Sequence, residues 1–151
     1  MRYTNPRWLE GNQHRAIVET IAMMTFNPSI GRVLAAGSGQ KFKSIAWRGV
    51  RGLKSLRDQL AFDHFHDRLV LRTRRLIRHT ARRRTMSYGQ AQKPVNVFLK
   101  VYVDWAKLPD RKTAIRLAKY LHVPLDSVVM GRVRREHRDD YHQIGGCPGS
   151  C

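Results

Sequence analysis

The chain has 151 residues and a formal net charge of +18, from 29 Lys and Arg residues against 11 Asp and Glu residues. Its 42% hydrophobic content is too high for a disordered basic tail, and no run approaches the roughly 20 apolar residues that cross a bilayer. The length predicts one domain, and the lack of a long apolar run predicts no membrane contact. Because the surplus of positive charge costs self-repulsion in a compact state, we also expect a polyanionic partner, of which nucleic acid is the first candidate.

The N-terminal quarter predicts an irregular arm followed by two helices. Pro6 and Gly11 break regular structure, so we expect an irregular arm over residues 1–12. A helix is predicted over residues 13–26, where apolar residues recur at helical spacing. These apolar residues are Ile17, Val18, Ile21, Ala22 and Met24. A second, short helix is predicted over residues 30–36.

An interrupted helix is predicted from residue 41 to residue 84. Gly49 and Gly52 favour a break, and after it apolar residues recur at spacings of mostly three, four or seven. These apolar residues are Leu53, Leu56, Leu60, Phe65, Leu69, Leu76 and Ile77. Arginines repeat at four, three, three and four residues, which predicts a basic ridge on a helix whose other face packs. The ridge consists of Arg68, Arg72, Arg75, Arg78 and Arg82.

Residues 94–106 carry two competing patterns. Alternating apolar residues are typical of a strand, whereas polar residues at spacings of three and four are typical of a helix. The polar residues are Lys93, Asn96, Lys100, Asp104 and Lys107. Just upstream, Ser87 and Gln90 have the spacing of a capping box, which opens a helix. We therefore predict a mostly buried helix.

The C-terminal part predicts two further helices, over residues 110–121 and 125–137, joined by a turn at Pro124. A flexible tail is expected over residues 138–151. Together these elements predict an all-α fold. It is a single compact helical domain over residues 13–137, with a long Arg-rich helix and a C-terminal helical hairpin.

The basic residues gather in one segment, from Arg68 to Arg84, which holds eight arginines and no acid. Arginine binds phosphate with two parallel hydrogen bonds, so this segment is predicted to contact nucleic-acid phosphates. The predicted contacts here are Arg68, Arg72, Arg74, Arg75, Arg78, Arg82 and Arg83. Because phosphate contacts do not read sequence, base contacts are expected elsewhere, on the polar face of residues 93–100 or in the C-terminal hairpin. The candidates there are Lys93, Asn96, Lys100, Arg132, Arg134 and Arg135. Nothing in these patterns chooses DNA over RNA.

The segment TAIRLAKYLHVPLDSVVMGRV, residues 113–133, resembles a helix-turn-helix. Its apolar and small residues occupy the places where that motif packs two helices across a tight turn. These are Leu117, Ala118, Leu121, Val123 and Val128. His122 stands where the motif's turn usually carries glycine. The resemblance implies DNA binding by this element, and a plain helical hairpin packed into the core is the alternative.

The string SYGQAQKPVNVFLK, residues 87–100, resembles a pattern of uncharacterised small prokaryotic helical proteins. In that pattern an aspartate/histidine pair precedes the string, here Asp63 and His66, and a turn follows it, here Pro124 to Ser127. The resemblance implies no particular activity. The amide and ammonium groups of the string either serve a ligand beside the arginine ridge or cap neighbouring helices.

A nuclease is the alternative function. Asp63 and His66 lie three residues apart on one helical face, and such a pair can bind a divalent metal ion or move protons near neutral pH. The string from Arg74 to His79 resembles the R-x-x-x-x-H pattern of the HEPN ribonucleases, which implies RNA cleavage at a dimer interface. Asp63, His66 and His79 are thus the candidate catalytic residues. A pure binding protein needs no cofactor.

Candidate zinc ligands stand at the end of the chain. They are His137, His142, Cys147 and Cys151. All four residue types bind zinc, and a disordered end is the alternative.

The two cysteines cannot cross-link the fold and the N-terminus lacks an apolar signal core, so we expect a cytoplasmic protein. The third function class is a basic subunit of a larger nucleoprotein assembly, or a homodimer.

Overall fold

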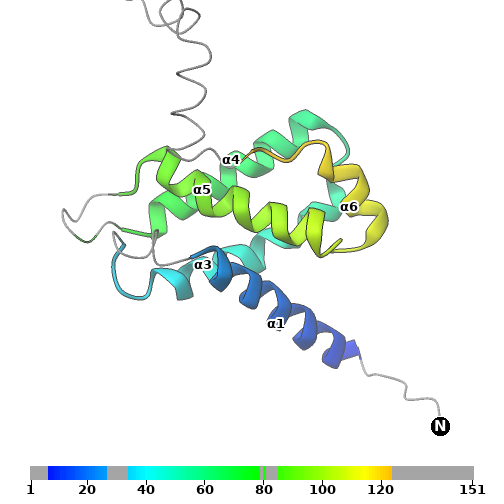
Figure 1. Cartoon of the computed structure of the whole chain (residues 1–151), viewed down its shortest axis with the longest axis horizontal. Helices are drawn as coiled ribbons and strands as arrows, with labels where there is room; N and C mark the ends of the chain where they lie inside the picture. The colour runs from blue at the N-terminus through cyan, green and yellow to red at the C-terminus, as the bar shows by residue number, and fades with distance from the viewer. Residues whose placement is uncertain (1–6, 27–33, 79, 81–84, 124–151) are drawn as a thin grey trace, which may run out of the picture.

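The computed structural model describes residues 7–26, 34–78, 80 and 85–123, and every regular element in these ranges is helical (Figure 1). The elements are α1 (Arg7–Thr25), α3 (Ser38–Val50), a 3-10 turn (Leu53–Ser55), α4 (Gln59–Leu76), α5 (Tyr88–Leu99), a π-helical segment (Lys100–Trp105) and α6 (Arg111–Ala118). The predicted all-α fold is confirmed. None of these helices is long and apolar enough to span a membrane.

Side-chain caps determine where three of the helices begin. Asp58 caps α4 and Asp110 caps α6, each by accepting a backbone N–H at 2.8 Å. Ser87 and Gln90 form the predicted capping box at the start of α5. These side chains pair N–H groups that the first helical turn leaves without intrahelical partners, and one such cap typically stabilises by about 1 kcal/mol.

The helix predicted over residues 94–106 is confirmed. After α5 the chain continues into the π-helical segment, where the Ala106 N–H donates to the Val101 carbonyl at 2.9 Å. α5 packs against α4 and also against α1. A helix covered from two directions buries residues around much of its surface, and this explains the strand-like alternation of apolar residues. The buried ones include Val95, Phe98, Leu99, Tyr102 and Val103.

Aromatic side chains from several helices fill the centre of the core. Phe42 of α3 meets Phe98 of α5 edge to face at 6.0 Å, and Phe98 stacks on Tyr102 at 5.6 Å. The Tyr102 hydroxyl is hydrogen-bonded to Nε2 of His14 at 2.7 Å. The core therefore joins α1, α3 and α5, while α4 packs against both α3 and α5 (Figure 1).

The N-terminal predictions need three corrections. α1 begins at Arg7, inside the segment predicted to be an irregular arm. Within residues 11–25 its buried stripe consists of Val18, Ile21, Ala22 and Thr25, whereas Ile17 and Met24 are exposed. Residues 17 and 24 are seven apart and so lie on the same side of the helix, next to its buried face. The short helix predicted over residues 30–36 lies mostly outside the described residues, and its described part, from residue 34, is not helical.

The predicted long arginine helix is interrupted where expected but ends early. α4 stops at Leu76, because Ile77 turns to extended backbone and buries its side chain completely. Arg78 then pairs with Thr85 in an isolated antiparallel bridge, and its carbonyl accepts the Ala35 N–H at 2.9 Å. These tertiary partners replace the next helical turn. Arg78 therefore does not share the helical face of the other arginines.

Candidate nucleic-acid interface

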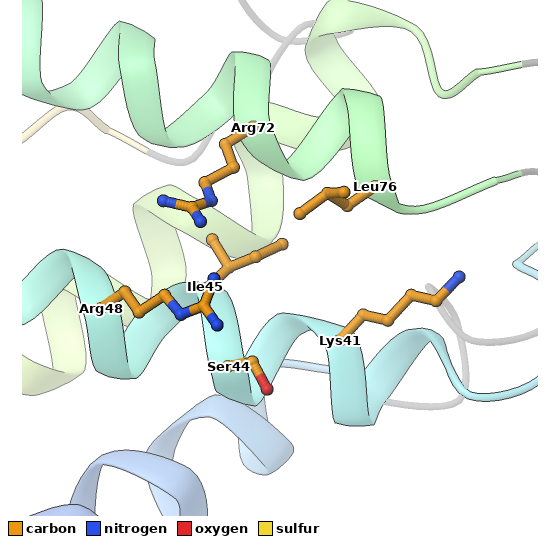
Figure 2. A pocket seen from close by; sticks show the side chains of 6 residues that line it. All are labelled: Lys41, Ser44, Ile45, Arg48, Arg72 and Leu76. Atoms are coloured by element: carbon orange, nitrogen blue, oxygen red, sulfur yellow. The ribbon is translucent and has the colours of Figure 1, made fainter.

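A basic groove runs between α3 and α4. Its floor is apolar and includes Ile45, Phe65 and Leu69. Its cations are Lys41 and Arg48 from α3 and Arg68 and Arg72 from α4, and Arg75 lines an adjoining hollow formed by α4 residues alone. In Figure 2 Arg72 and Leu76 extend from α4 toward α3, and Ile45 lies between the two helices. We call this surface the α3–α4 groove.

Gly49 allows α3 to approach α4 closely at one end of the groove. A Cβ atom on Gly49 would lie 2.9 Å from Cδ1 of Leu69, whereas one on Gly52, just after α3, would lie at an ordinary contact distance of 3.6 Å from the Phe65 ring. Along the groove lie three adjoining hollows of about 200, 250 and 550 Å³, all of which share Arg72. Gly49 is therefore part of what shapes the groove, and Gly52 lines it.

The charge of the groove is not neutralised. No acidic residue lines any of the three hollows. None of the five cations has a side-chain hydrogen bond or ion pair within the described ranges. Other cations do have acidic partners, as in the pairs Lys54–Asp110 and Lys100–Asp104. Fields from like charges along a concave surface add, so the groove attracts anions.

The structure divides the predicted arginines into separate roles. Arg68, Arg72 and Arg75 line the groove, as the helical spacing predicted. Arg74 instead donates through Nε to the Met86 carbonyl at 2.8 Å and so ties α4 to the chain before α5. Arg78 lies in the bridge beyond α4.

The sequence reasoning missed the two cations that α3 contributes. Lys41 and Arg48 are seven residues apart, which places them on the same helical face. Their spacing was visible in the sequence, but only the packing of α3 against α4 shows that they oppose the arginines.

Two of the three residues predicted to form a polar face on α5 have partners within the fold. Asn96 is buried and Lys93 is partly buried, while Lys100 pairs with Asp104 at 2.7 Å. Asn96 contacts His66 of α4, which lies on a different side of that helix from the groove residues. Asn96 and Lys100 thus have partners within the fold.

Histidines of two segments meet on the other side of α4. His66 is fully buried, and its Nε2–H donates to Oδ1 of Asn96 at 2.6 Å. Asn96 in turn donates to the Val123 carbonyl at 3.3 Å. His122 donates through Nε2 to Oδ1 of Asp63 at 2.8 Å, and its ring lies 4.1 Å from that of His66. We call Asp63, His66, Asn96 and His122 the histidine cluster.

Burial and hydrogen bonding determine the protonation of the histidine cluster. Burial lowers the pKa of His66, which therefore stays neutral near neutral pH, and its Nδ1 is buried without a hydrogen-bond partner. The hydrogen bond from His122 lowers the pKa of the Asp63 carboxyl. Nearby, a hydrogen bond to Asp67 raises the pKa of the Tyr88 hydroxyl to about 12.

The structure brings together two of the three candidate catalytic residues. Asp63 and His66 do lie close together, and His122 is the remote partner that local spacing could not reveal. A partly exposed aspartate–histidine pair can transfer protons. However, the cluster lies across α4 from the groove. Across the described part of the chain, no three His, Cys, Asp or Glu side chains are placed to hold a metal ion.

The remaining candidate residues lie outside the described ranges. They are His79, Arg82, Arg83, Arg132, Arg134, Arg135, His137, His142, Cys147 and Cys151. The second helix of the helix-turn-helix-like segment, its Pro124 turn and the tail predicted over residues 138–151 lie there as well. The first helix of that segment is α6, which buries Ala114 and Leu117 in the core.

Comparison with known proteins finds no relative of this chain. The chain matches no protein-family model, no curated protein and no solved structure. Within the described residues, the α3–α4 groove brings together five cations that have no side-chain hydrogen bond or ion pair.

Proposed function

We propose that this protein binds nucleic acid through the α3–α4 groove. The observation that carries the proposal is the set of five cations on two facing helices, with no lining acid and no ion-pair partner among the described residues. Elsewhere in a folded protein such charges are usually paired or dispersed. A concentrated row of unpaired arginines is the electrostatic footprint that a phosphate backbone complements.

The binding mechanism is charge neutralisation with release of counterions. Each guanidinium presents a planar fork of N–H donors that can bind two oxygens of one phosphate. Every phosphate neutralised releases condensed counterions, so the affinity falls as salt rises. Arg68 and Arg72 are four residues apart, about 6 Å along the helix axis, so they can engage successive phosphates. Contacts of this kind position the protein without reading sequence.

The groove geometry favours binding over nuclease activity. The histidine cluster, which contains the candidate acid and base, lies across α4 from the cations that would hold the substrate. In the HEPN-like string, Arg74 is engaged by the Met86 carbonyl and α4 ends before His79. A basic subunit of a larger assembly would use the same groove. Its signature would be poor solubility of the isolated chain and rescue by its polyanionic partner.

Replacing two groove arginines tests the proposal directly. In Arg68→Gln/Arg72→Gln, two phosphate contacts are lost, so affinity for nucleic acid at low salt should fall about tenfold or more. The slope of log affinity against log salt should also become shallower, by about 1.4 to 1.8. Fluorescence anisotropy with labelled oligonucleotides across a salt series measures both quantities.

The matched control is Arg57→Gln/Arg111→Gln, which removes the same charge from exposed positions that do not line the groove. It should leave the salt slope close to that of the wild type. An equal loss in both double variants would show that overall charge, and not the groove, binds the polyanion. Denaturing gels of the same mixtures, with and without magnesium, would show fragments if the protein is a nuclease.

A further inference from the structure

We infer that the α3–α4 groove takes a single nucleic-acid strand in preference to a duplex, with the bases placed against its apolar floor. This inference rests on the proposed function and adds the form of the ligand. Three observations carry it: the apolar surface between the cations, the covered sides of α4 and the size of the hollows.

Apolar surface lies among the groove cations. The floor contains Ile45 and Leu69, and beside it Leu71 and Leu76 are 51% and 42% exposed on α4. A duplex presents charged phosphates outward and keeps its bases stacked inside. Pressing its backbone onto leucine would desolvate phosphate oxygens without pairing them. A single strand can instead turn its bases onto this surface while its phosphates meet the arginines.

The sides of α4 are too covered for it to act as a recognition helix. α3 packs on one side of α4 and α5 packs on another. A helix with its side chains is about 10–12 Å wide and the DNA major groove is about 12 Å wide, so a recognition helix must stand clear of its neighbours. Here Lys41, Arg48, Arg68 and Arg72 line a trough between two helices, and Arg75 lies on the adjoining exposed face of α4. Such a trough accommodates a single nucleic-acid strand and excludes a duplex.

The two hollows between α3 and α4 have the size of parts of a nucleotide. They measure about 200 and 250 Å³, below the roughly 300–1,000 Å³ of sites that enclose a whole small molecule, whereas the third hollow, formed by α4 residues alone, measures about 550 Å³. The two smaller hollows adjoin one another through Ile45, Arg48 and Arg72. A row of small, connected hollows suits a chain of repeating units. Arginine planes beside them can stack on unpaired bases.

The experiment compares one labelled strand, DNA and RNA in turn, with its duplex of the same length, at several salt concentrations. We expect the full-length protein to bind the single strand at least about tenfold more tightly. The variant Leu71→Gln/Leu76→Gln changes two exposed side chains that no core contact requires. It should weaken single-strand binding about fivefold or more and leave the salt slope unchanged, because stacking is lost and no phosphate contact is.

Leu60→Gln is the matched control, because Leu60 lies on the same helix, is 67% exposed and does not line the groove. It should bind like the wild type. Equal or tighter binding of the duplex, with no effect of the leucine changes, would overturn the inference and leave the proposed function standing. Failure to bind either form, or tighter binding of an acidic amphipathic peptide, would overturn both.

Discussion

Burial of the His66 imidazole makes the folded state sensitive to acid. Its Nε2–H is committed to Asn96, so a second proton must enter at Nδ1, a buried atom without a hydrogen-bond partner. The facing ionisable groups are His122, Asp63, Asp67 and, through Asp67, Tyr88. Because burial lowers its pKa, the unfolded chain binds this proton more tightly than the folded chain does.

We therefore expect the free energy of unfolding to fall as pH drops below about 6.5, the ordinary histidine pKa, and to level off below the lowered pKa of folded His66. The stability that neutral His66 contributes is fully present above pH 6.5. His66→Gln keeps a donor for Asn96 but does not titrate. Urea unfolding between pH 5 and 7.5 should show a flatter pH dependence for this variant.

Burial also lowers the pKa of His14, so this residue changes the free energy of unfolding with pH in the same direction as His66. Its contribution therefore needs a separate control. The double variant His14→Gln/His66→Gln should be flatter than either single variant. The lowered carboxyl pKa values of Asp63, Asp104 and Asp110 affect stability only below about pH 4, outside this window. Parallel curves for wild type and His66→Gln would contradict the role given to His66.

At the scale of the elements, the contact between α3 and α4 depends on the absence of a side chain at residue 49. Gly49 lies against Leu69, which is itself buried. A glycine inside a helix costs about 1 kcal/mol relative to alanine, so its presence here has a packing reason. Larger residues would move Leu69 or separate the helices, and the groove would change with them.

Gly49→Val should destabilise the protein by about 1–3 kcal/mol through overpacking, and it should weaken oligonucleotide binding by widening the groove. Gly89→Val is the matched control, because Gly89 also lies in a helix and a Cβ there meets nothing within 4 Å. That variant should be neutral or slightly stabilising. Equal thermal stability of the two variants would show that α3 and α4 do not meet as described.

At the scale of the whole molecule, charge repulsion opposes the compact state. A formal +18 on 151 residues leaves many cations without acidic neighbours, and those of the α3–α4 groove are among them. Salt screens such repulsion, with a Debye length of about 10 Å at 0.1 M. The same salt weakens attachment to a polyanion. Stability and binding should therefore respond to salt in opposite directions.

Raising sodium chloride from about 0.02 to 0.3 M should raise the melting temperature of the free protein by about 2–4 °C, the shift that about 1 kcal/mol produces in a chain of this size. Over the same range, oligonucleotide affinity should fall. Differential scanning calorimetry measures the first effect, with sucrose as an uncharged control solute. A melting temperature that drops with salt would mean that attractive ion pairs outweigh the repulsion.

Much of the helical architecture was predictable from local patterns. Asp58, Asp110 and the Ser87–Gln90 pair start helices through bonds that span three residues, so nearby sequence suffices to predict them. The spacing of Arg68, Arg72 and Arg75 likewise placed them correctly on one face. The end of α4 was not predictable in this way, because Ile77 leaves the helix to fill the core and Arg78 is held by Ala35.

The chain sequence by itself determined the helical class, the caps, the surplus of positive charge and the row of arginines on α4. Each of these depends on residue type or on spacings of a few residues. Only the tertiary structure decided that Lys41 and Arg48 face that row and that Asn96 is buried. It also brought His122 to Asp63, 59 residues away. Such contacts depend on how helices pack, and packing is settled by the whole core together.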